Sequence, residues 1–190
     1  MRVLRSDLDA VGSSVASAFD SEIADAEKII TVLDNFMGDI GSGTKLTGSA
    51  YENIKSQLGE QKALMEKRRT LALSMKESIE SAIRSMGDYM GGYSKLDTDD
   101  LTEIEASISS AETSISNLKS KLNNIDDNST NDNMKGIIMG TIGGYEFKLS
   151  ELYKWRDKLK GLPGASAGAW GCLSEAIGGL TVYNSGSSSV

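Results

Sequence analysis

The sequence predicts an all-α fold, an elongated bundle of about four long antiparallel amphipathic helices arranged like a coiled-coil rod. In four long stretches apolar residues recur every three or four positions, which is the helix period, and the 190 residues include a single proline. Polar or glycine-rich breaks separate the stretches. Each predicted helix can therefore fold back along the one before it.

The first predicted helix covers residues 6–37. Ser6 and Asp9 have the capping-box spacing at its start. At about 1.5 Å per residue the helix is roughly 50 Å long, well beyond the usual length in globular proteins. Its apolar stripe consists of Leu4, Leu8, Val11, Val15, Phe19, Ile23, Ala26, Ile30, Leu33 and Met37.

A Leu-x-Gly turn, Leu46-Thr47-Gly48, follows a glycine-rich break and precedes the second helix. Ser49 and Glu52 have the spacing of a capping box, so a helix is expected to begin there. We expect Gly48 to let the two helix backbones approach closely, because it has no side chain, and Leu46 to cover the turn.

The second predicted helix extends to about Tyr89. Its stripe consists of Tyr51, Ile54, Leu58, Met65, Ala72, Met75, Ile79, Ile83, Met86 and Met90. A second apolar line, Leu64, Leu71 and Leu73, lies away from this stripe near the middle of the helix. Two apolar faces need two neighbours, so we expect this line to contact a partner protein or another helix of the same chain.

The third predicted helix begins at residues 97–100, where carboxylates favour the positive end of the helix dipole. Its stripe has the regular spacing of a coiled-coil seam. The seam consists of Leu101, Ile104, Ile108, Ala111, Ile115, Leu118, Leu122 and Ile125. Because the other faces are rich in Ser, Thr and Asn, burial of the seam has to hold this helix in place.

The fourth predicted helix follows a polar loop at residues 126–133. Its stripe consists of Ile138, Ile142, Tyr145, Leu149, Leu152 and Leu159. Lys158, Lys160, Gly161 and Pro163 are typical of a helix end, so the helix is expected to stop before Pro163. Beyond it, residues 163–190 are rich in Gly, Ala and Ser and are interpreted as a linker.

Two smaller motifs have open interpretations. The basic run Lys67-Arg68-Arg69 is either a solvated helix face whose charges balance those of Glu60 and Glu66, or a docking patch for an acidic partner. A glycine repeat, Gly136, Gly140 and Gly144, predicts close packing against another helix, the alternative being a contact between helices in a membrane.

Composition argues against several classes of function. The chain has no histidine and one cysteine, Cys172, so it lacks the commonest metal ligand and any disulfide framework. The carboxylates have no nucleophile, phosphate loop or ligand cluster beside them, and we expect no catalytic residue, metal or cofactor. A formal net charge of −7 argues against nucleic acid as a partner.

The Leu46-Thr47-Gly48 turn between two long helices, followed by Ala50, Tyr51 and Lys55, resembles the LXG domain. This domain is the N-terminal targeting region of toxins exported by the type VII secretion system of Gram-positive bacteria. The resemblance covers most of the chain. It implies that residues 1–162 form an LXG-like helical targeting domain, and that residues 163–190 are a linker or the start of an absent C-terminal toxin region.

The resemblance also implies a function without catalysis. The domain would bind small WXG-like helical partner proteins and present the complex to the type VII machinery. Export would occur from the cytoplasm without a cleavable signal peptide, which agrees with Asp7 and Asp9 interrupting the apolar core that such a peptide needs. Tyr153 and Asp157 resemble the Tyr-x-x-x-Asp/Glu export signal of this system; the alternative is a packed tyrosine beside a surface aspartate.

The alternative function is a membrane-perturbing helical toxin whose Gly-rich segments insert into a bilayer. Residues 164–183 are the candidate for membrane contact, because Glu175 is the one charge within them.

Overall fold

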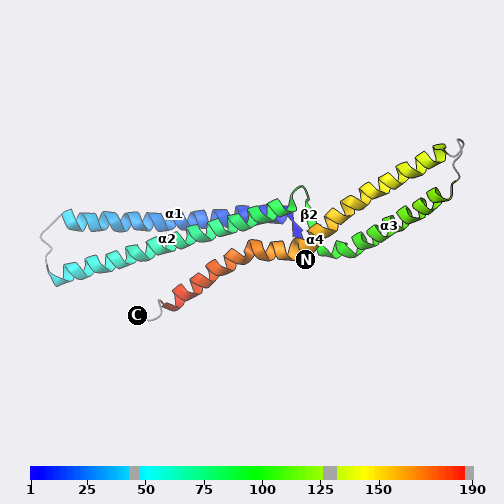
Figure 1. Ribbon diagram of the computed structural model, residues 1–190. Coiled ribbons are helices and arrows are strands. Elements are labelled where there is room, and N and C mark those ends of the chain that lie inside the picture. The colour runs from blue at the N-terminus through cyan, green and yellow to red at the C-terminus, as the bar shows by residue number, and fades with distance from the viewer. Residues whose placement is uncertain (43–47, 126–131, 187–190) are drawn as a thin grey trace. The chain divides into compact units, whose positions relative to one another are not determined.

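The computed structural model describes residues 1–42, 48–125 and 132–186, and for residues 40–42 and 172–186 it describes the backbone alone. Over these residues the chain is almost entirely helical, so the predicted all-α fold is confirmed (Figure 1). The four helices are α1 (Arg5–Ser42), α2 (Ser49–Met90), α3 (Leu101–Asn123) and α4 (Asp132–Gly186). The chain divides into two compact units, one holding Arg5–Gly91 and Ala167–Val190 and the other Met1–Leu4 and Gly92–Ser166.

In the first unit, α1 and α2 form an antiparallel hairpin (Figure 1). The helices have 38 and 42 residues, so each is about 60 Å long, in agreement with the long stripes of the sequence. Small apolar residues on both helices are buried, among them Ala26, Ala72 and Ala82. Such residues let two helices approach closely along a thin core.

Arg5 holds the start of α1 to the end of α2. Its Nη1 donates to the Gly87 carbonyl at 3.0 Å and its Nη2 to the Gly91 carbonyl at 3.4 Å. Gly91 itself has φ +58 and ψ −124, a backbone conformation that favours glycine, and its N–H donates to the Gly87 carbonyl at 3.0 Å. A cation beside the negative end of the α2 dipole stabilises this closed base of the hairpin.

A ladder of ion pairs runs along one edge of this hairpin. Lys62 pairs with Asp34 at 2.6 Å, Arg69 with Glu27 at 2.7 Å, and Lys76 with Asp20 at 2.5 Å. Each step moves seven residues along α2 and seven back along α1, as the antiparallel heptad geometry requires. Hydrogen bonds to Asp34 and Asp20 raise the pKa values of Lys62 and Lys76, so the lysines stay charged and the pairs are kept until strongly alkaline pH.

The arginines of the basic run Lys67-Arg68-Arg69 form ion pairs with other acidic residues than we predicted. Arg69 belongs to the ladder, and Arg68 pairs with Glu22 of α1. The acidic residues that pair with Arg68 and Arg69 are therefore on α1, not Glu60 and Glu66 of α2, because antiparallel packing brings the two helices side by side.

The second unit begins with a small antiparallel ribbon of β1 (Arg2–Leu4) and β2 (Lys95–Asp97), in which Val3 pairs with Leu96. The ribbon was not predicted, because three-residue strands carry no periodic signal. Leu96 is fully buried. A single 3-10 turn, η1 (Thr98–Asp100), leads from the ribbon into α3.

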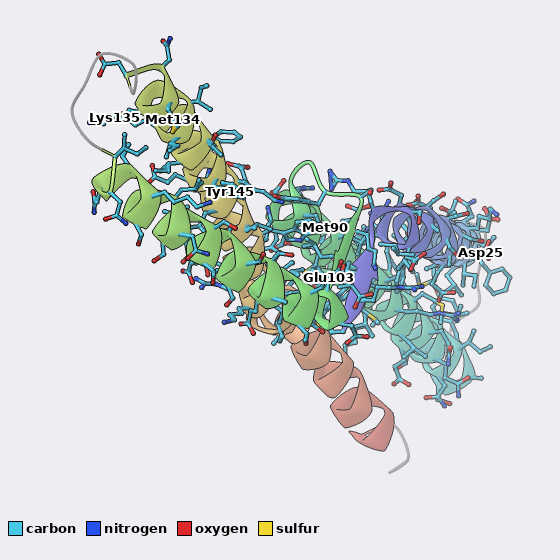
Figure 2. All side chains as sticks on the ribbon, turned by 90° about the vertical axis from the view of Figure 1, so that its right-hand side faces the viewer. Asp25, Met90, Glu103, Met134, Lys135 and Tyr145 are labelled. Carbon is cyan, nitrogen blue, oxygen red and sulfur yellow. The ribbon has the colours of Figure 1, made fainter. Side chains whose placement is uncertain are left out.

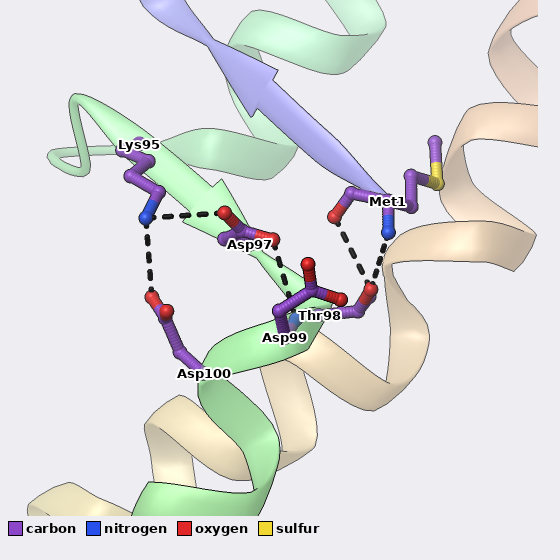
Figure 3. A network of polar contacts seen from close by, with 6 residues as sticks. All are labelled: Met1, Lys95, Asp97, Thr98, Asp99 and Asp100. Carbon is purple, nitrogen blue, oxygen red and sulfur yellow. Dashed lines mark hydrogen bonds and ion pairs between the residues drawn. The ribbon is translucent and has the colours of Figure 1, made fainter.

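The carboxylate of Asp97 makes two polar contacts at the junction of β2 and η1 (Figure 3). Its carboxylate accepts the backbone N–H of Asp99 at 3.2 Å and pairs with Lys95 at 3.1 Å. The bond from the Asp99 amide, and then the one from Lys95, lower the pKa of Asp97, so the carboxyl stays ionised although it is 8% exposed. Asp97 therefore caps the 3-10 turn η1, whereas α3 begins after Asp100, whose side chain makes no capping hydrogen bond.

α3 and the first half of α4 form the second hairpin, and it too has a heptad ladder. Glu105 pairs with Lys160 at 2.7 Å, Glu112 accepts the Tyr153 hydroxyl, and Lys119 pairs with Glu146 at 3.0 Å. Between these edges the predicted seam of α3 is confirmed. Its buried members are Ile104, Ile108, Ala111 and Ile115, and on α4 they are Ile142 and Leu159.

The predicted end of the fourth helix is wrong, because α4 continues through Pro163 to Gly186. A proline inside a helix removes one backbone hydrogen bond and costs about 3 kcal/mol. Leu159, Leu162 and Ala169 are buried on both sides of the proline, and their burial offsets this cost. Whether residues 163–190 serve as a linker stays a prediction.

The glycine repeat of α4 is also not packed as predicted. A Cβ added at Gly136, Gly140 or Gly144 would meet nothing within 4 Å among the described residues. α3 packs instead on the side that carries Ile142, because the larger apolar side chains lie there.

Replacing Ile108 or Ile115 by Asp should unfold the second hairpin. Both residues are buried, and a buried carboxylate without a partner costs at least about 3 kcal/mol. Circular dichroism should show lost helix and a lower melting temperature. Ser110→Asp, at an exposed position of the same helix, is the matched control and should melt like the wild type. Unchanged melting of the Ile108 variant would show that the seam is not buried.

Exchanging the charges of one ladder pair should restore what either single exchange removes. Glu27→Arg and Arg69→Glu each place like charges opposite one another and should lower the melting temperature by about 1–3 °C. The double variant should recover most of this loss. Glu60→Arg, outside the ladder, should have little effect, and 1 M salt should shrink all the differences. Additive losses in the double variant would contradict the pairing.

Candidate partner-docking groove

An open apolar groove lies on the hairpin of α1 and α2 in the first unit. It has a volume of about 950 Å³. Most of its lining comes from α2 between Ala63 and Met75, and α1 adds Phe19 and Glu22. This length of α2 is about 18 Å, or three turns, which matches the apolar face of one short helix.

Leu64 and Leu71 both line the groove, as predicted for a line separate from the core. Seven residues apart, they lie on the same side of α2, and Leu64 is 38% exposed. Leu73 does not line the groove. Two residues beyond Leu71, it is turned by about 200° around the helix and lies on another side. The sequence therefore grouped three residues of which the structure brings two together.

The groove combines adaptable apolar side chains with a charged rim. Met65 and Met75 line it beside the leucines, and methionine adjusts its shape to different partners. Exposed Lys67 stands on the rim, as does Arg68, which is paired with Glu22. Glu66 lines the groove as well, so the rim carries charges of both signs. Such a surface fits an amphipathic helix that has apolar residues three, four and seven positions apart.

The Leu-x-Gly turn is described only from Gly48 onward; Leu46 lies outside the described residues. Gly48 directly precedes α2, and its carbonyl accepts the N–H of Tyr51 at 3.1 Å. No side chain caps this helix start, so the predicted Ser49 capping box is wrong, since Ser49 is already the first helical residue.

The reason for the glycine also differs from our expectation. Gly48 has φ +127 and ψ 172, a conformation open essentially to glycine alone. An added Cβ would meet no described atom within 4 Å. The position therefore needs glycine for its backbone angle, and close approach of the two helices is not the cause.

Tyr153 and Asp157, the predicted export signal, both lie on α4 one turn apart. The Tyr153 hydroxyl donates to Glu112, which raises the pKa of the tyrosine, and the Arg156 guanidinium lies 4.7 Å from its ring centroid. Arg156 also binds exposed Asp157 with bonds of 2.6 and 2.8 Å. Tyr153 thus has a structural role in the ladder, and its role in export stays a prediction.

Other kinds of site have no counterpart in the described part of the chain. Its Asp and Glu residues form no group of three or more that is suited to hold a metal ion. None of its helices combines the length and the apolar character that crossing a bilayer requires.

Comparison with known proteins adds no relative: no family model, curated protein or solved structure matches this chain.

The polar ladders were not predicted, although the sequence contains a signal for them. Asp20, Glu27 and Asp34 repeat every seven residues, as do Lys62, Arg69 and Lys76. Reading the two repeats in opposite directions would have predicted the register of the hairpin.

Gly48→Ala should destabilise the first hairpin by about 1–3 kcal/mol, because alanine at φ +127 is strained. Gly59→Ala is the matched control: this glycine is inside α2 with open space around it, and alanine there should stabilise by about 0.5–1 kcal/mol. Thermal melting of both variants measures the difference. If close approach were the cause, Gly48→Leu would be far worse than Gly48→Ala; similar losses are expected instead.

Proposed function

We propose that this chain is a non-catalytic export and targeting domain of a type VII secreted toxin, which binds small helical partner proteins. The observation that carries the proposal is the open apolar groove on the α1 and α2 hairpin, lined by Leu64, Leu71, Met65 and Met75. A groove three turns long on a helical hairpin accepts another helix by the same packing that joins the two helices.

The second support is the resemblance of the Leu46-Thr47-Gly48 turn to the LXG domain. In the described part, this turn leads into α2 through Gly48, whose φ of +127 ties the glycine of the motif to a fixed backbone shape. The motif then acts mechanically, by setting how the chain enters the helix that carries the groove.

The mechanism follows from helix alignment. A partner helix placed in the groove buries Leu64 and Leu71 and puts an acidic side chain beside Lys67. The combined helices then present a joint surface to the secretion machinery, to which Tyr153 and Asp157 of the second hairpin are candidates to contribute. Export occurs without a cleavable signal peptide, as the resemblance implies.

Charged substitutions in the groove should abolish partner binding without unfolding the chain. The test is co-expression with each small protein of predicted helical fold that the neighbouring reading frames are found to encode, followed by measurement of the mass and affinity of any complex. The variant Leu64→Asp with Leu71→Asp should weaken binding by at least about 30-fold, the size of a hot-spot loss. Ile54→Asp is the matched control, because Ile54 is an exposed residue of α2 outside the groove.

Two results would contradict the proposal. Lost helicity in the double variant would show that the two leucines are core residues of the chain itself. A wild-type chain that binds none of the small helical neighbours and makes lipid vesicles leak would favour the membrane-perturbing alternative.

A further inference from the structure

The last part of α4 extends beyond the helix with which its first half forms a hairpin. Each step of the second ladder moves seven residues along α3 and seven back along α4, so the first residue of α3, Leu101, is level with Gly164. From there α4 continues to Gly186, about 33 Å further. α3 therefore does not cover residues 167–186 of α4, which we call the tail.

The buried side of α4 nevertheless continues beyond α3. Leu159 and Leu162 are fully buried, and Ala169 is 5% exposed. The sequence extends this side at alternating steps of four and three residues, the spacing of a helix seam, through Leu173, Ala176, Leu180 and Tyr183. Glu175 is the one charged residue of the tail and is not a member of this series. The tail thus has an apolar stripe that needs a neighbour.

The hairpin of α1 and α2 is the neighbour that the topology offers. Residues Ala167–Val190 belong to the same compact unit as Arg5–Gly91. The chain enters this unit at Arg5 and leaves it after Gly91, and Arg5 binds the Gly91 carbonyl, so both points lie at the base of the hairpin. A helix that enters the unit at this base can run along the hairpin toward its tip, antiparallel to α2.

Burial along α2 is uneven. Near its end, Ala82 and Met86 are 1% exposed and Met90 is 0% exposed (Figure 2). In contrast, no described residue from Ser49 to Leu71 is buried. α1 lies beside both halves of α2, so the second half has a further cover. Leu71 is on the same side of α2 as Ala82, about three turns away, and the groove therefore continues a covered side of the helix toward the tip.

We propose that the tail docks along α2 as a third helix of the first unit, with Ala167 at the base of the hairpin and the last turns in the groove. Leu71 lies about 28 Å along α2 from Met90, and the tail is about 30 Å long, so its end reaches Leu71. Leu64 is about 10 Å further and stays uncovered. Because the groove is open in this structure, the docked tail is a second, closed arrangement of the same chain.

Charge and attachment favour the tail as the occupant of this end of the groove. The lining residues from Thr70 to Met75 are uncharged, and the charged residues of the rim lie toward the tip: Glu66, Lys67 and Arg68. The tail has no charged residue after Glu175, so its last turns match the uncharged end. A segment joined to its site by the same chain has an effective concentration in the millimolar range, which a second copy reaches only in concentrated solution.

Docking of the tail would regulate the groove. A partner helix that needs Leu71 binds the open arrangement alone, so its apparent affinity is reduced by the fraction of chains that are open. This competition rests on the proposed function, whereas docking of the tail on α2 does not.

Cysteine cross-linking tests the docked arrangement in the full chain. In a Cys172→Ser background, which removes the one native cysteine, Tyr183→Cys is combined with Ser74→Cys or, as the matched control, with Ser56→Cys. Both serines are exposed residues of α2, but Ser56 is about 27 Å further toward the tip. Under mild oxidation the Ser74 pair should form an intramolecular disulfide at least about tenfold faster than the Ser56 pair. Equal rates would overturn the proposal, as would disulfides that form between chains only.

Thiol labelling tests whether the tail covers Leu71 and leaves Leu64 free. In the same background, Leu180→Asp should raise the labelling rate of Leu71→Cys at least about fivefold, because a charge in the apolar stripe prevents docking. The rate of Leu64→Cys should not change. Thr181→Asp, next to the stripe, is the matched control and should leave both rates unchanged. Labelling of Leu71→Cys that does not respond to Leu180→Asp would overturn the docking.

Partner binding separates this inference from the proposed function. Leu180→Asp should tighten binding of a helical partner at least about threefold, and Thr181→Asp should not. A chain that binds no helical partner would refute the proposed function, while the cross-linking and labelling results would still decide the docking. Binding of the chain to phosphatidylglycerol vesicles that requires Leu180, with unchanged labelling of Leu71→Cys, would overturn the docking and assign the stripe to a membrane surface.

Discussion

The register between the two helices of each hairpin is the constraint on which the described structure depends. A pair of long helices with a thin apolar seam can slide by one heptad and still bury similar side chains. The polar ladders oppose such sliding. On the first hairpin a shift of seven residues would still match some charges of the ladder, but it would break the bonds from Arg5 to Gly87 and Gly91. The closed base and the ladder together select one register.

In the second hairpin the register of the two helices is fixed by different contacts. Its ladder includes a tyrosine, Tyr153, whose hydroxyl donates to Glu112 midway between two ion pairs. At its base the ribbon of β1 and β2 and the Asp97 cap fix where α3 begins. Each hairpin is thus held by heptad contacts along its length and by a specific polar contact at one end.

The sequence predicted the helices well, because a stripe that repeats every three or four residues depends only on helix geometry. The seam from Ile104 to Ile115 is buried as predicted. Features that depend on contacts between segments were harder to predict. The end of α4 was missed because burial around Pro163 outweighs a local stop signal, and Leu73 was grouped with Leu64 and Leu71 because a count of apolar residues ignores the angle between them. At Gly48 the need for glycine was predicted, but its cause is the backbone angle.

A two-helix hairpin cannot bury all the apolar residues that its helices carry, because each helix has one neighbour and most of its circumference stays exposed. The charges and side-chain sizes beside each exposed apolar patch then determine which partner can bind there. The groove at Leu64 and Leu71 has a rim with both Glu66 and Lys67, so a partner has to match charges of both signs. On the second hairpin Ile137 and Phe147 stay exposed for the same reason, because among the described residues α3 covers the opposite side of α4, which carries Ile142.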